Sequence, residues 1–308
     1  MHRLLQFLSP GIIGILAVFL SIIWMLRNEK DKTRPLLVFA LVLNLFYGWL
    51  LTFFLGKEDS LVPNKYDYIL HQLDGTLGIS AAAIAIPLQG GWRQPLFIVY
   101  ELMIPMMIAW FLAVRGQNDR QSLVLAYIAE LVAGPILYAI LPACGPIYAF
   151  GPAWLHPPAI AAQTMRLTGM PNAFPSLHIA TAFVLVLFAR GKILRAIALA
   201  FLLATALATV ATGEHYLIDL IPGLIFGCFA ASAGCRQLRS TVLFLAVALF
   251  WSLAARFEYP YLIASPVLLR SLVVVTLAIA IWTFVKRWRT LDVEITVQSP
   301  ELTTANLN

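Results

Sequence analysis

Long apolar runs separated by short polar connections make up most of this 308-residue chain. Their lengths are near the ~20 residues that an α-helix needs to cross a hydrocarbon core, and the alternation typical of strands is absent. We therefore expect an all-α integral membrane protein, a polytopic helical bundle of about 9–10 membrane segments. The runs are Gly11–Leu26, Leu36–Leu55, Leu96–Val114, Leu123–Pro142, Phe174–Ala189, Ile193–Val210, Leu217–Ala233, Thr241–Phe257 and Val267–Val285.

One further apolar run, Thr76–Leu88, is shorter than the others and contains Gly78 and Pro87. A segment of this length is too short for a straight span, so we predict an interfacial or re-entrant segment near residues 76–88.

Composition and charge support a membrane protein with a defined orientation. Hydrophobic residues form 61% of the chain and charged residues 12%, against roughly 45–50% and about 25% in soluble domains. The 21 Lys and Arg residues divide fourteen to seven between the two sides if the short run does not span, and thirteen to eight if it does. The richer side is expected to be cytoplasmic, so we predict a multi-pass protein of the plasma (inner) membrane. The sequence has no basic patch interleaved with aromatic residues, so it does not indicate a nucleic-acid partner.

Two polar islands interrupt the apolar background, Asn172 to His178 and His215 to Asp219. Each island stands where an apolar run is about to begin, and both fall on the extracytoplasmic side of the predicted topology. Polar and ionisable residues at membrane depth usually mark function, although each one alone is about as well explained as a helix cap.

The spacing within the islands favours chemistry on a phosphate group. His215 and Asp219 are four residues apart, so on a helix they share a face, and the carboxylate can fix the imidazole tautomer. The other nitrogen is then free to attack or to bind a metal. His178 opens a second helix, where Ser176 and the free backbone N–H groups make an anion site. A phosphate bound there would present its phosphorus to His215 and its leaving oxygen to His178.

The islands resemble the second and third motifs of the type 2 phosphatidic acid phosphatase superfamily, whose usual forms are PSGH and SRxxxxxHxxxD. Here they read Pro175-Ser176-Leu177-His178 and His215-Tyr216-Leu217-Ile218-Asp219. They are closest to the inositol phosphorylceramide synthase (inositolphosphotransferase) branch, where FPSLH and HYxxD follow a Pro-Cys-x-x-Pro segment. This chain has Leu141-Pro142-Ala143-Cys144-Gly145-Pro146 upstream. The resemblance covers roughly residues 122–235.

The resemblance implies a six-helix core and catalysis without a metal or other cofactor. It implies that His215 is the nucleophile that carries the phosphoryl group and that Asp219 orients it. His178 would protonate the leaving group, and Ser176 would hold a phosphate oxygen. The implied partners are a phospholipid donor and a lipid or alcohol acceptor.

The chain departs from the superfamily at three cations. In the first motif, KxxxxxxRP, Tyr138 stands at the lysine and Gly145 at the arginine, and Thr209 stands at the arginine of the third motif. Either backbone N–H groups carry more of the anion's charge or another cation reaches the site. Arg166, in the long connection between residues 143 and 173, is the candidate by location, and contact with lipid headgroups is an equally good explanation for it.

Other polar residues are less informative. Glu101 and Glu130 lie inside apolar runs, where a functional and a structural carboxyl are equally good interpretations. Tyr66-Asp67 and His71-x-x-Asp74 are weakly similar to an N-terminal motif of the synthase branch, and we favour plain interfacial anchoring for them.

Three functions follow in order of preference. The first is a lipid phosphotransferase that passes a phosphorylated headgroup between lipids through a phosphohistidine. The second is a lipid phosphate phosphatase, of the phosphatidic acid or polyprenyl phosphate type, in which water resolves the same intermediate. The third is a transporter with a His/Asp proton relay, which the lack of paired broken helices in two matching halves disfavours. We divide the chain into N-terminal membrane helices (1–121), a catalytic membrane core with C-terminal helices (122–289) and a disordered polar tail (290–308).

Overall fold

A computed structural model describes residues 63–114, 116–157, 164–167 and 170–298, together with residues 19, 23, 33–39, 41–42, 53 and 56. Most of the predicted runs Gly11–Leu26 and Leu36–Leu55 therefore lies outside the described residues. Side chains are described as far as Leu291.

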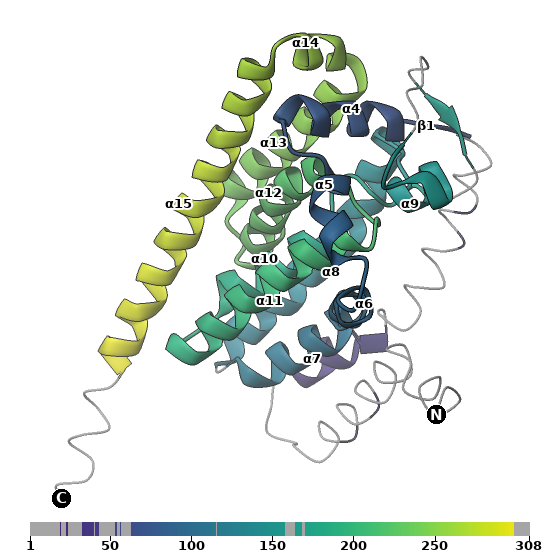
Figure 1. The fold of residues 1–308 in the computed structure, drawn as a ribbon. Coiled ribbons are helices and arrows are strands. Elements are labelled where there is room, and N and C mark those ends of the chain that lie inside the picture. Colours follow the sequence, from purple (N-terminus) through teal and green to yellow (C-terminus); the bar gives the residue numbers. More distant parts are fainter. Residues whose placement is uncertain are drawn as a thin grey trace, which may run out of the picture.

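The described chain is almost entirely helical (Figure 1). Its only strands among the described residues form a short antiparallel ribbon that pairs Asn64 with Arg166. In chain order the elements are β1 (Asn64–Lys65), α4 (Asp67–Leu77), α5 (Ala81–Ala85), the 3-10 helix η1 (Ile86–Leu88), α6 (Arg93–Glu101), α7 (Met103–Ala113), α8 (Gln117–Ile140), α9 (Pro146–Phe150), the 3-10 helix η2 (Gly151–Ala153), β2 (Met165–Arg166), α10 (Leu177–Phe188), α11 (Lys192–Ala211), α12 (Leu217–Gly234), α13 (Leu238–Phe257), α14 (Tyr259–Ala264) and α15 (Pro266–Gln298).

Five described helices, α8, α11, α12, α13 and α15, are long and apolar enough to cross a membrane. Two bent pairs raise the number to seven if each pair is one span: α4 with α5–η1, bent by 74°, and α6 with α7, bent by 52°. The first pair contains the run Thr76–Leu88, for which a re-entrant segment was predicted. The two pairs follow one another directly before α8, so they do not occupy matching positions in two halves as a transporter repeat would. The predicted helical membrane bundle is confirmed.

The predicted span Phe174–Ala189 is shorter than expected. Its helical part is the 12-residue α10, because the chain is bent at residues 174–175 and extended at the N-cap Ser176. At ~1.5 Å per residue this helix covers about 18 Å, less than the ~30 Å hydrocarbon core. The start of α10 therefore lies inside the bundle.

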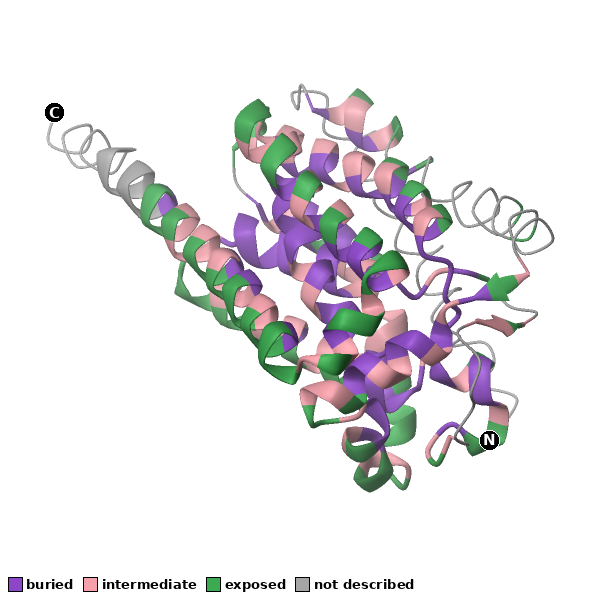
Figure 2. Ribbon diagram, turned by 90° about the horizontal axis from the view of Figure 1, so that it is seen from above, coloured by how far each residue is buried: buried purple, intermediate pink, exposed green. Residues whose placement is uncertain are grey.

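Helix α12 forms the centre of the bundle, and α15 lies at its edge. Of the apolar window of α12, 78% is buried, against 17% for α15. Figure 2 shows this contrast, with buried residues concentrated among the inner helices and α15 mostly exposed or intermediate. Exposed apolar side chains on an outer helix such as α15 face lipid. The polar island from His215 to Asp219 stands instead at the start of the buried helix α12.

Two glycines bring α12 and α10 into close backbone contact. A Cβ added to Gly223 would lie 2.8 Å from the carbonyl oxygen of Ser176, and one added to Gly227 would lie 2.7 Å from that of Ala180. Small residues four apart allow membrane helices to approach this closely. The contact fixes the start of α10 against the start of α12.

Helix α15 continues into the segment predicted to be a disordered tail. It runs to Gln298, eight residues past the start of that segment at Thr290, and residues 299–308 lie outside the described residues. Residues 290–298 contain no glycine or proline, so nothing in the backbone chemistry stops the helix there.

Candidate active site

Both polar islands meet at one end of the bundle, here called the histidine end, where α10 and α12 begin and α4 packs on the start of α12. The backbone N–H of Ser176 donates to the carbonyl oxygen of Asp219 over 3.1 Å. The structure therefore brings Ser176, His178, His215 and Asp219 together from two segments of the sequence.

His215 lies in the turn between α11 and α12 and is 3% exposed. Its Nδ1 lies 2.8 Å from the carbonyl oxygen of Ala173 and 3.5 Å from Oδ2 of Asp219. Since a carbonyl only accepts, Nδ1 carries the hydrogen, and Nε2 keeps its lone pair. The predicted tautomer-fixing bond is therefore made to Ala173 rather than to Asp219.

Asp219 is fully buried in the first turn of α12. Its Oδ2 accepts the backbone N–H of Tyr216 over 2.8 Å, and its Oδ1 has no hydrogen-bond partner among the described residues. The carboxylate thus ties the turn that carries His215 to the helix that follows.

His178 lies on the first turn of α10 and faces His215 edge-on. The ring centroids are 6.0 Å apart, with an interplanar angle of 66°. Tyr100, at the end of α6, stacks on the other face of the His178 ring with a centroid distance of 3.9 Å. Nothing in the local sequence distinguishes Tyr100 from other interfacial tyrosines, so this contact could not be predicted.

The first turn of α10 provides open hydrogen-bond donors. Ser176 Oγ accepts the N–H of Ile179 over 3.4 Å, which leaves the hydroxyl hydrogen available. The backbone N–H groups of Leu177 and His178 have no acceptor among the described residues. Unpaired N–H groups at a helix start form an anion site, and these stand beside both imidazoles.

The start of α12 is already occupied by a carboxylate from α4. Asp74 is fully buried and accepts the N–H groups of Leu217 and Ile218 over 2.9 and 2.8 Å. It also accepts the N–H of Ala81, the first residue of α5, over 3.3 Å. Because these donors are taken, an anion has open N–H groups at α10 and not at the first turn of α12.

Asp67, two turns before Asp74 on the same face of α4, holds the loop that precedes α9. Its carboxylate accepts the N–H groups of Cys144 and Gly145, the latter over 2.8 Å, and the hydroxyl of Tyr216 over 3.1 Å. Interfacial anchoring, the favoured interpretation of Asp67 and Asp74, is therefore wrong for both. Their weak motif similarity was the signal that pointed to the site.

One of the three departures from the superfamily pattern has a structural reason. Gly145 has φ +94°, and a Cβ there would collide with the carbonyl oxygen of Glu214. Thr209 is fully buried, its hydroxyl bonds to Ala206, and its carbonyl accepts the N–H groups of both Glu214 and His215. A long cationic side chain has no room at Gly145, whereas the bonds that the Thr209 carbonyl makes to the turn do not depend on its side chain.

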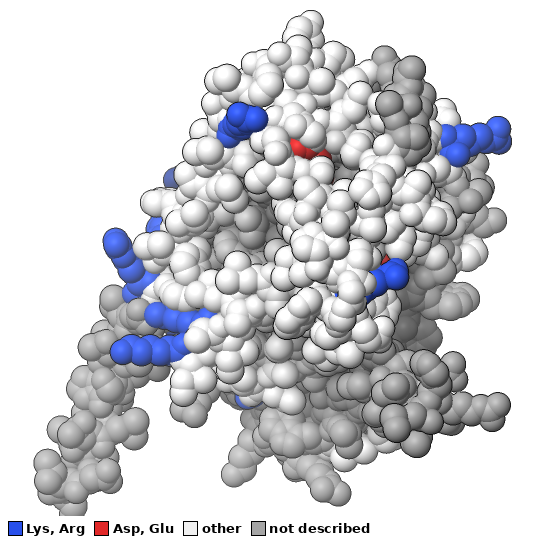
Figure 3. Space-filling model, viewed as in Figure 1, with Lys and Arg blue, Asp and Glu red and all other residues white. Residues whose placement is uncertain are grey.

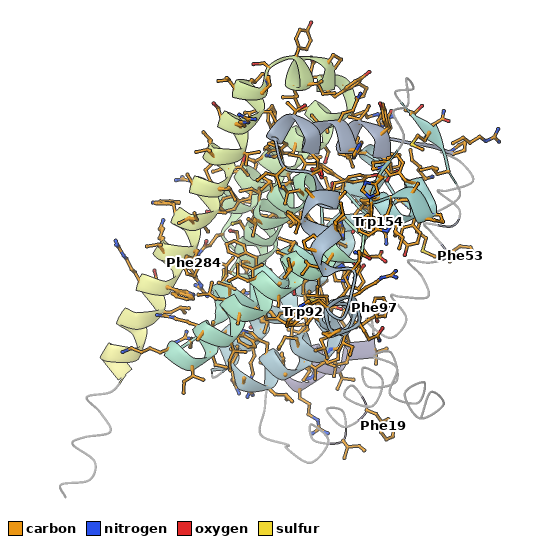
Figure 4. All side chains as sticks on the ribbon, in the orientation of Figure 1. Phe19, Phe53, Trp92, Phe97, Trp154 and Phe284 are labelled. Carbon is orange, nitrogen blue, oxygen red and sulfur yellow. The ribbon has the colours of Figure 1, made fainter. Side chains whose placement is uncertain are left out.

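Trp154, labelled in Figure 4 beside α9, covers the neighbouring Gly213. A Cβ on Gly213 would lie 3.2 Å from the indole ring. The connection after residue 143 therefore packs on the turn that carries His215, as expected of a loop that covers a site.

Arg166, the candidate replacement cation, lies in β2 at the periphery of the molecule, and its side chain is exposed. The structure gives it no hydrogen bond or ion pair with the two histidines among the described residues. Lys65, in the strand that pairs with β2, is fully buried.

Glu214 adds a negative charge next to the nucleophile candidate. Its carboxylate accepts the hydroxyl of Tyr148 over 3.1 Å. Burial lowers the pKa of His215 to about 4, while the charge of Glu214 and the bond to Ala173 act to raise it. Burial also raises the pKa of Glu214 above its ordinary value. At neutral pH the imidazole of His215 is therefore uncharged.

The other intramembrane carboxyls lie outside this cluster. Glu130, on α8, is buried and accepts a short hydrogen bond from Thr181 of α10, and Glu101 is half-buried at the end of α6. In the described part of the chain, no group of three or more His, Cys, Asp or Glu side chains has the arrangement of a metal site.

Comparison with known proteins gives one family. No curated protein and no solved structure matches the chain. Residues 69–233, more than half of the 308, match the PAP2 superfamily. The match contains both histidines, Asp219 and Asp74, and it begins within α4. The inositolphosphotransferase branch receives no separate support. The chain is a membrane phosphatase or phosphotransferase that belongs to the PAP2 superfamily.

Proposed function

We propose that this protein is a lipid phosphotransferase that moves a phosphorylated headgroup from a phospholipid to an acceptor alcohol through a phosphohistidine on His215. The observation that carries the proposal is the meeting of two histidines at an open helix start, in a site where the superfamily's arginine position at Gly145 is closed. His178 acts as acid and then as base, and Asp219 positions the turn.

In the first half-reaction, Nε2 of His215 attacks the phosphorus of the donor phosphodiester. The P–N bond forms, the P–O bond to the diacylglycerol breaks, and His178, whose protonated form the bound phosphate anion stabilises, gives its proton to the leaving oxygen. In the second half-reaction the acceptor hydroxyl gives its proton to His178 and its oxygen attacks the phosphorus. The P–N bond then breaks and both histidines return to their starting states.

The missing cations favour a phosphodiester donor over a phosphomonoester. A phosphomonoester carries about 1.5 to 2 negative charges at pH 7. A phosphodiester has no second ionisable oxygen and carries one. Open N–H groups at Leu177 and His178, with the hydroxyl of Ser176, suit the smaller charge, and the carboxylate of Glu214 nearby disfavours the larger one. Arg166 is a candidate contact for the donor headgroup at the periphery.

The positive-inside distribution supports an extracytoplasmic site in the plasma (inner) membrane. Donor and acceptor would then enter from the outer side of the bilayer, next to α4 and the ribbon of β1 and β2.

Hydrolysis is the second candidate, because it shares the covalent half-reaction and differs only in the molecule that resolves it. It is favoured by His178 being only half-buried, which gives water a route to the second step.

The test uses purified full-length protein with phospholipids labelled in the headgroup phosphate, with and without acceptor alcohols. Free phosphate, released headgroup phosphate and new phospholipid are measured in parallel. We expect new phospholipid from a diester donor and slow release of phosphate from phosphatidic acid. Faster hydrolysis of phosphatidic acid than transfer from any diester would overturn the proposal in favour of a phosphatase.

Two variants assign the covalent step. His215→Gln should abolish both transfer and headgroup label trapped on the protein after acid-free denaturation. Asp219→Asn should fold and lose a factor of order 10² in kcat, because it loosens the Tyr216 bond that holds the turn carrying His215. Trapped label that persists in His215→Gln would remove this residue from the mechanism.

A chelation series tests the metal-independent mechanism. Activity should survive prolonged chelation, and vanadate, which mimics a five-coordinate phosphoryl group, should inhibit competitively. Loss on chelation with recovery on adding zinc or manganese would favour metal-assisted hydrolysis instead.

A further inference from the structure

A cavity lies at the opposite end of the bundle from the histidine end. It is a groove of about 780 Å³ between the first half of α13 and the last half of α15, with the end of α12 as its floor. The floor residues Cys228 to Cys235 lie nine to sixteen residues beyond Asp219 on α12. At ~1.5 Å per residue this is about 14–24 Å along the helix, so the groove is separate from the histidine site.

The shape of the groove follows from how α13 and α15 are joined. Near the histidine end, the indole N–H of Trp251 on α13 donates to the hydroxyl of Thr276 on α15 over 3.1 Å, and α14 links the two helices. Toward the other end α15 runs down one side of the bundle (Figure 1). The groove opens below the Trp251 contact, between helices that both pack on α12.

Most of the groove wall is apolar, and its outer edge faces lipid. Phe244 and Ile279 lie inside it, and Leu243 and Trp282 at its edge are about 60% exposed. Its volume is within the range of roughly 300–1,000 Å³ typical of pockets that hold one small ligand. An apolar cavity open to the bilayer favours acyl chains over water.

The polar rim of the groove is basic. Arg239, Lys286 and Arg287 line it, and no carboxylate is among the described residues that do so. Arg287 lies 4.0 Å from Asp119, which also pairs with Arg190, whereas the ammonium of Lys286 lies 4.9 Å above the ring of Trp282. Figure 3 shows several basic side chains together at this end, beside the lower half of α15.

We propose that this groove binds one anionic phospholipid of the adjacent leaflet, with its acyl chains between α13 and α15 and its phosphate at Arg239 and Lys286. Basic pockets between membrane helices recognise anionic headgroups in this way. A second copy of the chain is a poorer occupant, because a two-fold contact would bring the same cations face to face.

The test measures lipid retained by the purified full-length protein in native mass spectrometry. Phosphatidylglycerol and phosphatidylcholine with identical acyl chains are added in turn. Each cation near a membrane surface changes anionic-lipid binding about fivefold, so Arg239→Gln with Lys286→Gln should weaken phosphatidylglycerol binding roughly 25-fold. Phosphatidylcholine binding should change little. Phosphatidylglycerol should raise the thermal unfolding midpoint of the wild type and leave that of the double variant unchanged.

The matched control is Lys192→Gln with Arg289→Gln, which removes two exposed charges from the same end of the bundle outside the groove. It should bind phosphatidylglycerol as the wild type does. Equal retention of the two lipids by the wild type, or equal losses in the two double variants, would overturn the proposal. So would a lipid-free dimer that the groove variant alone dissociates.

Discussion

Replacing Asp74 by asparagine should move the first turn of α12 and with it the reacting groups. Asp74 never enters the proposed chemistry, but both of its oxygens accept backbone N–H groups from Leu217 and Ile218. These residues lie between His215 and Asp219 in the sequence. An amide at this position keeps one acceptor and turns an N–H group toward a second N–H group.

The expected magnitude follows from the contacts. A hydrogen bond to a charged group contributes about 1.5–3 kcal/mol, and a carboxylate at a helix start adds about 0.3–1 kcal/mol through the helix dipole. Losing one such bond and the charge in a fully buried position should destabilise the protein by about 2–4 kcal/mol. A shift of ~1 Å in the reacting groups costs about 10²-fold in rate.

The assay measures kcat and KM per folded molecule, with thermal unfolding followed in the same detergent. We expect kcat to fall about 10²-fold with KM little changed, since Asp74 does not touch the donor. Glu258→Gln is the control, because Glu258 is an exposed carboxylate at the same end with no capping bond. A variant that unfolds earlier but keeps the wild-type kcat would reduce Asp74 to a structural residue. Wild-type values of both would refute the reasoning.

His178→Ala should lose most activity on natural donors and much less on a donor with an acidic nitrophenol leaving group, because a general acid matters in proportion to leaving-group basicity; equal losses would argue against the acid role. The pH profile of kcat/KM should show its acid limb below pH 6.5, near pH 4, since burial lowers the pKa of His215 and the neutral imidazole is the nucleophile. Glu214→Gln removes a charge that raises this pKa, so it should move the limb to still lower pH; a wild-type limb at or above pH 6.5 would contradict this. Gly145→Arg, which restores the superfamily's arginine, should lower the yield of folded protein rather than raise phosphatase activity, since φ +94° and the Glu214 carbonyl leave no room for a side chain.

The helical membrane fold was predictable because apolar runs of spanning length report directly on the bilayer as solvent. The structure differs from the prediction at the start of α10 and at the end of α15, where the local sequence is compatible with more than one helix boundary. Phe174–Ala189 is apolar enough to span, but the N-cap at Ser176 starts α10 late. The segment after Thr290 is polar and has few apolar side chains to bury, yet its backbone continues helix α15.

The candidate site was predictable as residues and only partly as geometry. His178, His215, Asp219 and Ser176 were selected from two motifs, and the structure brings them together. The hydrogen-bond partner of His215 could not be predicted, because it is the backbone carbonyl of Ala173 and every residue has such a group.

The sequence by itself determined that this protein is a helical membrane bundle with two polar islands at one surface, because hydropathy and residue spacing act locally. Only the tertiary structure decided which groups hold those islands in place. Asp67 and Asp74 read as interfacial residues along the chain, yet they are buried and bond to backbone that lies 77 and 143 residues away. Their role comes from α4 crossing the starts of α9 and α12, a contact between distant segments that no local pattern of polar and apolar residues encodes.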